Sequence, residues 1–319
     1  MKPAFSLLSP AGARGRLSVL IFHRVLAQPD PLFPDEMDAA RFDALLGWVK
    51  AWFNVLPLDE AIRRLDEGSL PARAAALSFD DGYADNHDVA LPLLRRHRLP
   101  CSFFVATGFL DGGRMWNDTL IESVRLSTLP TLDLRGLVDA HGDDLGSHAL
   151  ASTDDRRAAL GRLIERVKYL PPEPRLACVQ AIARRAEVVP PDDLMMSSAQ
   201  VRALRAAGMQ IGAHTVSHPI LAKLDNHQAS DEIARSRDAL QALLGEKVRL
   251  FAYPNGKPGT DYRPDVHPGI VRELGFDAAV STRWAAARQG DDVFQIPRFT
   301  PWDRSRVRFG LRLARNLFS

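Results

Sequence analysis

The sequence predicts an α/β fold, and within that class a (β/α) barrel with about seven parallel strands and a helical insertion. Short apolar runs alternate with amphipathic helical patterns along the chain, as in parallel sheets whose strands are joined by helices. The alternation recurs about seven times, which favours a barrel over an open sheet. The 319 residues are 46% hydrophobic and 25% charged, which is ordinary for one large domain or two smaller ones.

The predicted strands are short apolar runs. The first, at 17–22, reads LSVLIF, and the second, at 74–79, runs directly into two aspartates and a glycine. Continuous apolar runs of this length are typical of strands that are buried on both faces. Further strands are predicted at 102–106, 209–213, 248–253, 278–281 and 293–299.

Helices are predicted between the strands, where apolar residues recur every three or four positions. The segment 198–207 follows a serine that can cap a helix, and Gly208 ends it. From about 115 to 195 the chain is richer in charged helical patterns and contains Pro-Pro-Glu-Pro at 171–174. We expect one barrel domain over 1–319 with a helical insertion in that stretch. The other predicted helices are 39–53, 58–65, 89–97, 231–244 and 268–274.

The C-terminal segment, about 303–319, predicts a basic amphipathic helix. It carries five arginines against one aspartate, and Val307, Leu311, Ala314 and Phe318 recur at helical spacing. Such a helix either packs on the domain with a solvated basic face or lies on an anionic lipid surface.

Composition narrows the class of protein further. Lys and Arg number 41 against 39 Asp and Glu, a formal net charge of +2 that argues against a nucleic-acid-binding protein. Two cysteines, Cys101 and Cys178, cannot build a disulfide scaffold. No run of about 18 apolar residues predicts a membrane span, and the N-terminus has no signal-peptide pattern. We expect a cytoplasmic location, with peripheral membrane contact through the C-terminal helix left open.

Carboxylates and imidazoles follow two predicted strands at their C-terminal ends, where barrel enzymes hold their catalytic groups. Asp80 and Asp81 follow one strand directly; taken alone, Asp-Asp-Gly is more often a turn with two solvated acids. His214 and His218 follow another strand, and at i and i+4 both imidazoles can meet one metal ion if the segment is helical. Two histidines and one aspartate would form a facial triad, which leaves coordination positions open for water and substrate.

Two further strand ends carry candidate residues. Tyr253, Pro254 and Asn255 begin a turn whose backbone N–H groups could hold a developing oxyanion, although such a turn is also common in ordinary loops. His23 ends the first strand, and a single histidine in that position is more often a core residue than a catalyst.

Together, these residues resemble the polysaccharide deacetylase family of metal-dependent carbohydrate esterases. The run LSFDDGYADNHDVALPLLRRHRLPCSFFVATGFL resembles the first motif of the family with the helix and strand that follow it, and MQIGAHTVSHP resembles the second. The resemblance covers roughly 17–110 and 197–300. It implies a distorted (β/α) barrel of about seven strands, in agreement with the alternation of strands and helices.

The resemblance also implies a role for each residue that matches a motif. Asp80 would be the general base of the reaction. Asp81, His214 and His218 would hold a divalent metal ion, usually zinc in this family.

The third motif of the family is matched only in part. Tyr253, Pro254 and Asn255 resemble it, and by position the N–H of Asn255 would help to bind the oxyanion. The motif usually begins with an arginine that orients the base, but Ala252 stands there. Arg298, at the end of the last predicted strand, is our candidate for a substitute.

The late leucine-x-histidine motif, which supplies the general acid in the family, is absent after residue 267. Some long members resemble circular permutants in which that strand has moved to the N-terminus. Leu20-Ile21-Phe22-His23 fits this description, and a barrel tolerates the move because its first and last strands are neighbours. We therefore expect His23 to be the general acid.

The resemblance implies an enzyme of exopolysaccharide biosynthesis that removes N-acetyl groups from an N-acetylglucosamine-type polysaccharide or oligosaccharide and releases acetate. Two alternatives remain: an O-acetyl esterase or other small amide or imide hydrolase with the same metal site, and a carbohydrate-binding protein with a degenerate site. Trp116 either stacks on a sugar ring or anchors the insertion. The expected partner is a glycan and no nucleic acid, and the sequence predicts no particular oligomeric state.

Overall fold

The computed structural model describes residues 1–318, which form two compact units. The first unit comprises Met1–Gln28, Met37–Asp111 and the chain from Met195 onward. The second comprises Pro29–Glu36 and Gly112–Leu194. Among the described residues, no helix combines the length and the apolar character needed to cross a membrane.

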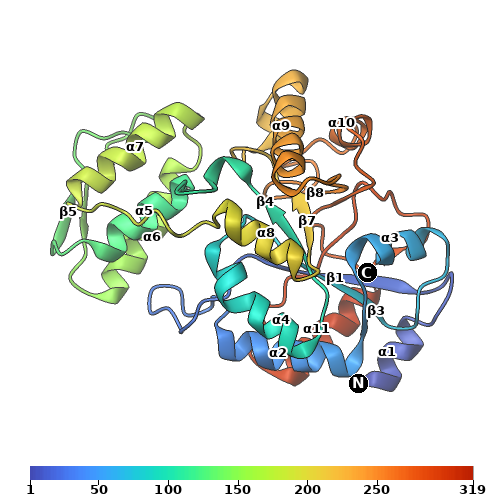
Figure 1. Ribbon diagram of the computed structural model, residues 1–319. Coiled ribbons are helices and arrows are strands. Elements are labelled where there is room, and N and C mark those ends of the chain that lie inside the picture. Colours follow the sequence, from blue (N-terminus) through green and yellow to red (C-terminus); the bar gives the residue numbers. More distant parts are fainter. Residues whose placement is uncertain (319) are drawn as a thin grey trace. The chain divides into compact units, whose positions relative to one another are not determined.

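The first unit is built around a curled sheet with the strand order β10-β1-β3-β4-β7-β8-β9, and β2 also pairs with β3 (Figure 1). These pairs are parallel except for β10 on β1. The bounds are β1 Arg16–Phe22, β2 Asn54–Val55, β3 Ala74–Phe79, β4 Ser102–Val105, β7 Gln210–Ala213, β8 Leu250–Ala252, β9 Ala278–Val280 and β10 Ala287–Arg288. Because parallel strands end at the same edge of a sheet, the residues that follow them are brought together.

The segment 293–299 is not the regular strand that the sequence predicts. It forms single bridges, from Ile296 to Val280 of β9 and from Phe299 to Leu20 of β1. Pro297 lies between these two contacts and has no N–H to donate, which interrupts a strand ladder. The irregular segment nevertheless joins the two sides of the curled sheet, so the predicted distorted (β/α) barrel is confirmed.

The helices of the first unit follow the predicted alternation with small shifts. The helix predicted at 231–244 begins earlier because the Asp225 side chain caps it in a capping box with Gln228. The predicted C-terminal helix begins at Arg306, and Ser319 lies outside the described residues. The bounds are α1 Lys2–Leu8, α2 Ala39–Trp52, α3 Leu58–Asp66, η1 Asn86–Ala90, α4 Leu91–His97, η2 Thr107–Phe109, α8 Ser198–Ala206, η3 Leu221–Lys223, α9 Asn226–Leu244, α10 His267–Glu273 and α11 Arg306–Phe318.

The second unit is mainly helical and has its own core. It contains α5 Trp116–Leu126, α6 Thr153–Val167 and α7 Pro172–Arg185, together with a two-stranded antiparallel sheet of β5 Thr131–Asp133 and β6 Ser147–Ala149. Buried leucines, isoleucine and valines from the three helices form one cluster. The proline-rich break starts α7, because proline is well tolerated in the first turn of a helix.

Phe104 of β4 is fully buried inside the barrel. Phe104 belongs to a buried cluster with alanines of β3, β8 and β9. Gly212 of β7 faces it so closely that an added Cβ would lie 2.5 Å from the phenyl ring. A glycine is therefore needed where the ring crosses β7.

Gly212→Ala should destabilise the protein by about 1–3 kcal/mol, because the new methyl group overpacks the barrel interior. Urea unfolding followed by tryptophan fluorescence would measure the change. Gly269→Ala is the matched control in the same unit, since a methyl group added at this position of α10 would meet no atom within 4 Å. The control should keep or slightly raise stability. Equal stability of the two variants would contradict this account of the core.

Candidate active site

Four strand ends meet at one edge of the curled sheet and carry most of the candidate residues. His23 follows β1, and the two aspartates follow β3. His214 follows β7, and Tyr253 follows β8. Residues from distant parts of the sequence are thus collected at the C-terminal ends of the parallel strands.

Asp81, His214 and His218 form a cluster that could hold a metal ion. Their ligand atoms all lie within 4.8 Å of one another. Oδ1 of Asp81 is 3.4 Å from Nε2 of His214 and 3.3 Å from Nε2 of His218. This oxygen is buried, and it makes no hydrogen bond of normal geometry to the described residues. Two imidazole nitrogens and one carboxylate oxygen suit a divalent ion.

The ring of His214 is fixed in the form that a metal requires. Its Nδ1 lies 2.8 Å from the carbonyl oxygen of Ala252. Because a carbonyl oxygen can only accept a hydrogen bond, Nδ1 carries the proton and Nε2 keeps its lone pair for a ligand.

The charges of the cluster are also suited to metal binding. Burial alone would raise the pKa of Asp81, but His214, His218 and His23 lower it below its usual value. Burial lowers the pKa of His218 to about 4. Burial also opposes the charge of His214, yet Asp80 and Asp81 raise its pKa overall. At neutral pH, Asp81 is therefore ionised and His218 neutral, the forms in which both can bind a metal ion.

Asp80 is buried beside the cluster and is held by Arg298. The guanidinium donates from Nη1 to Oδ1 and from Nη2 to Oδ2 of Asp80, both at 2.7 Å. Arg298 is itself buried, and its Nε donates to the carbonyl oxygen of Ser281 at 2.9 Å. Burial would raise the pKa of Asp80, but Arg298 and His214 lower it below its ordinary value. Asp80 is therefore a carboxylate at neutral pH.

Unusual backbone conformations occur at the same edge. Asp81, Thr215, His218 and Asn255 have φ values of 76°, 64°, 53° and 59°. Residues other than glycine adopt this left-handed region at a cost in energy, and such residues concentrate at functional sites. The turn at Asp81 also explains how two neighbouring carboxylates can face different partners.

His23 lies close to both aspartates. It is half-buried after β1, and its imidazole contributes to the lowered pKa of Asp80 and of Asp81. Its carbonyl oxygen accepts a hydrogen bond from Nδ2 of Asn86 at 2.9 Å.

The tyrosine side chain in the turn after β8 lies in the core, and the role of the Asn255 N–H stays a prediction. Tyr253 is buried in the core, where its hydroxyl donates to the carbonyl oxygen of Phe294 at 3.0 Å and its ring stacks on Tyr262. Asn255 is exposed, and its carbonyl oxygen accepts a hydrogen bond from Thr282 at 2.9 Å. Pro254 lies between them and is buried.

Trp116 lies in the second unit, at the start of α5. Its ring is covered by the guanidinium of Arg175 at 5.0 Å, and it packs against the core of that unit. These contacts agree with its role as an anchor of the helical segment.

Two supports of the site have no signal in the sequence. Glu232 of α9 accepts hydrogen bonds from the backbone N–H groups of Val216 and Ser217, both at 2.9 Å, and from the Ser217 hydroxyl at 2.7 Å. It thereby fixes the loop between the two histidines. Asp85 accepts from Arg24 Nε at 2.8 Å and from the Val25 N–H at 3.1 Å, beside His23.

Residues 67–156 and 179–279, together more than half of the chain, match the sequence profile of the family described as Polysaccharide deacetylase. The chain belongs to the polysaccharide deacetylase family. It is therefore a carbohydrate deacetylase, a hydrolase of a family that is typically metal-dependent, and the resemblance of its motifs to this family is confirmed.

Individual relatives agree with this membership. A poly-β-1,6-N-acetyl-D-glucosamine N-deacetylase of Staphylococcus epidermidis is 23% identical over 212 residues, which cover 64% of this chain and 70% of the relative. The deacetylase PplD of Streptococcus pyogenes, solved with acetate, superposes with a TM-score of 0.60 at 17% identity and covers 95% of this chain and 98% of its own. IcaB of Ammonifex degensii also gives 0.60, at 20% identity, over 98% and 99% of the two chains.

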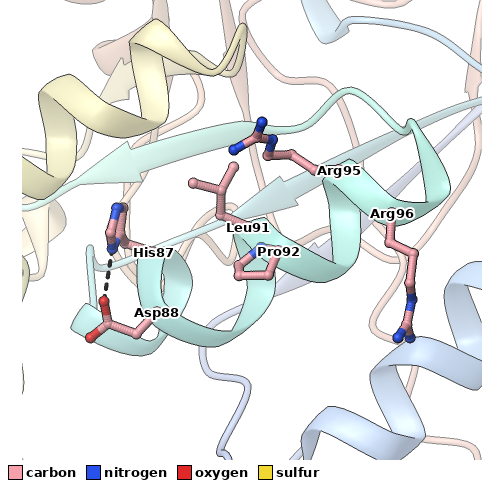
Figure 2. Close-up of a pocket in the computed structure, with 6 residues that line it drawn as sticks. All are labelled: His87, Asp88, Leu91, Pro92, Arg95 and Arg96. Atoms are coloured by element: carbon pink, nitrogen blue, oxygen red, sulfur yellow. Dashed lines mark hydrogen bonds and ion pairs between the residues drawn. The ribbon is translucent and has the colours of Figure 1, made fainter.

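A shallow cavity of about 700 Å³ lies on the helical turn η1 and on α4 (Figure 2). Figure 2 shows the ion pair at its rim, where Nδ1 of His87 lies 2.7 Å from Oδ1 of Asp88. The remaining lining residues are Leu91, Pro92, Arg95 and Arg96. The cavity contains none of the residues of the metal cluster.

Glu232→Ala should weaken binding of a divalent metal about tenfold or more, because groups that orient metal ligands have effects of this size. Titration of the metal-free protein with Zn²⁺ against a chromogenic chelator would measure it. Asp231→Ala is the matched control, since this neighbour on α9 is exposed and pairs only with Arg235 among the described residues. If both variants bound the metal like the parent protein, Glu232 would have no part in shaping the site.

Proposed function

We propose that this deacetylase removes N-acetyl groups from a β-1,6-linked polymer of N-acetylglucosamine. The buried Asp80–Arg298 pair beside the cluster of Asp81, His214 and His218 is the observation that carries the proposal. It combines an ionised base with a place for a divalent ion. The substrate class is supported by the relative from Staphylococcus epidermidis, whose name specifies that polymer.

Zinc is the metal that we propose for Asp81, His214 and His218. Two imidazoles and a carboxylate make a common ligand set for catalytic zinc. When bound, the ion would polarise the acetyl carbonyl group and lower the pKa of a water molecule.

The protein's own groups carry the proton transfers. Asp80 accepts a proton from the water molecule that attacks the acetyl carbonyl carbon, and Arg298 holds its carboxylate in place. Negative charge develops on the carbonyl oxygen, where the N–H of Asn255 donates a hydrogen bond. His23 gives a proton to the sugar nitrogen as the carbon–nitrogen bond breaks. The products are acetate and a free amino sugar.

The alternatives are less well supported. The family membership and the named relative favour an amide substrate over an acetyl ester. A degenerate binding protein would not need a buried ionised aspartate with its own arginine, because such a pair is costly to bury. The cytoplasmic location stays a prediction.

The parent protein should release acetate faster from β-1,6-linked N-acetylglucosamine oligomers than from O-acetylated sugars. The Asp80→Asn variant should release no acetate, although it should bind as much metal as the parent protein. The amide has the shape of the carboxylate but cannot accept the proton. Coupled acetate detection and metal analysis of the same samples would test both points. Asp88→Asn is the control, since it makes the same change at an exposed aspartate that pairs with His87 and is no part of the metal cluster. Near-normal turnover by Asp80→Asn would disprove its role as the base.

His23→Ala should lower kcat about a hundredfold and change KM little, because a general acid acts in bond cleavage rather than in binding. His87→Ala is the matched control: this histidine pairs with Asp88 in a cavity whose lining contains none of the candidate catalytic residues (Figure 2). Steady-state kinetics on one oligomer would compare the two. Unchanged kcat in His23→Ala would make His23 a packing residue.

A further inference from the structure

In the first unit, the exposed large hydrophobic side chains concentrate at the two terminal helices. Trp302 directly precedes α11, and the guanidinium of Arg315 in α11 lies 5.6 Å from the ring centre of Trp284. The described residues of this unit with large exposed apolar side chains are Met1, Leu7, Trp284, Trp302, Val307, Leu311 and Phe318. The other described large apolar side chains of this unit are buried or half-buried. The exposed ones are therefore concentrated in one region, which requires an explanation.

Helix α11 has two apolar faces, and only one of them is used by the core. Phe309, Leu313 and Leu317 are buried. On the other side, Val307, Leu311 and Phe318 are 69%, 62% and 68% exposed. Together with Ala314, these three residues fall within about 60° of arc at 100° per residue, and we call them the terminal stripe. A helix that packs on a domain needs a single apolar face.

Positive charge surrounds the terminal stripe. Arg308 and Arg315 lie along one flank of it at helical spacing, and the segment 304–315 carries three more arginines. The single acid, Asp303, is buried and is engaged by Arg312 at 2.7 Å and by Arg308 at 3.4 Å. The arginines therefore outnumber the acid, in a protein whose total formal charge is only +2.

We propose that the terminal stripe docks this protein onto an anionic phospholipid membrane. The apolar side chains would enter the interface between headgroups and acyl chains, while the flanking guanidinium groups bind phosphate. Trp284 and Trp302 add indole rings beside the stripe, and indole is favoured at membrane interfaces. The apolar residues lie on a helix flanked by cationic side chains, which suits a broad, anionic, fluid surface.

The path of the chain relates this surface to the active site. Arg298 contacts Asp80, and the next residue, Phe299, forms a parallel bridge with Leu20 of β1. The chain therefore leaves the barrel at the edge where the catalytic residues lie. Trp302 and the start of α11 follow directly. Only the start of α11 lies near that edge, because at its other end the carbonyl oxygen of Phe318 accepts a hydrogen bond from Arg288, which pairs with Arg16 at the start of β1. A glycan emerging from a membrane bound along α11 would therefore approach the catalytic edge at the start of the helix.

Co-sedimentation with vesicles tests the proposal. The parent protein should sediment with vesicles of equal parts phosphatidylglycerol and phosphatidylcholine, and little with phosphatidylcholine alone. Val307→Asn combined with Leu311→Asn should weaken the binding about tenfold or more, without changing acetate release from a soluble oligomer. Val189→Asn is the matched control, because this valine of the second unit is 94% exposed outside the stripe.

A second variant tests the charges. Arg315→Gln combined with Arg304→Gln should reduce binding to the anionic vesicles, and added salt should reduce binding of the parent protein. Equal binding by parent and stripe variant, or equal binding to both kinds of vesicle, would overturn the proposal. So would self-association in sedimentation equilibrium that only the stripe variant loses, because the stripe would then be a contact between two copies. The proposed deacetylase reaction is tested independently of membrane binding, because it is measured on a soluble substrate.

Discussion

The ion pair between Asp80 and Arg298 is the interaction on which the rest of the site depends. Two neighbouring carboxylates are buried at the end of β3, and each would be strongly unfavourable there without a counter-charge. The guanidinium neutralises Asp80 and fixes both of its oxygens. Asp81, turned away by its left-handed backbone, is left for the imidazoles of His214 and His218. One strand end thus carries a base held by Arg298 and a metal ligand that faces the imidazoles, although Nε2 of His214 also lies 4.0 Å from Oδ2 of Asp80.

This division requires a curled sheet. Arg298 comes from the irregular segment that bridges β9 and β1, whereas the histidines come from the loop after β7. A flat sheet would hold these elements apart, but curvature brings both to Asp80 and Asp81. Inside the curled sheet, Gly212 leaves room for the ring of Phe104, from which an added Cβ would lie only 2.5 Å away. Core packing and catalytic geometry are therefore linked, because Gly212 lies two residues before His214 and the Phe104 ring centre lies 5.8 Å from the Arg298 guanidinium.

Local patterns in the sequence were enough for β1, β3, β4, β7, β8 and β9, for most helices and for the motif residues. Continuous apolar runs identify β1 and β3, and the residues that end them are chemically distinctive. Contacts between distant segments were harder to predict. Glu232 accepts backbone hydrogen bonds from Val216 and Ser217, but it lies within helix α9, where a glutamate is common. The orientation of Tyr253 toward the core depends on Phe294 and Tyr262, and no pattern near Tyr253 reveals it.

Irregular structure accounts for the remaining differences. Pro297 prevents a regular strand at 293–299, although the apolar character of that segment suits one. The strands of the second unit have three residues each, too few for an alternation to be recognised. Helix α1 is short and has a proline in its first turn, so its stability comes from packing against α11 rather than from its own sequence.

Arg298 follows Asp80 by 218 residues in the sequence, and this separation has a consequence for synthesis. The ribosome releases Asp80 and Asp81 long before Arg298, so a nascent chain holds one carboxylate whose partner does not yet exist. Folding β3 into a closed core at that stage would bury an uncompensated charge. The barrel can therefore close with its full stability only when the last segment has emerged. A chain that stops before residue 293 would lack both Arg298, the partner of Asp80, and the segment that closes the barrel. Cellular quality control could then recognise such a chain by its exposed hydrophobic core, without any test of its activity.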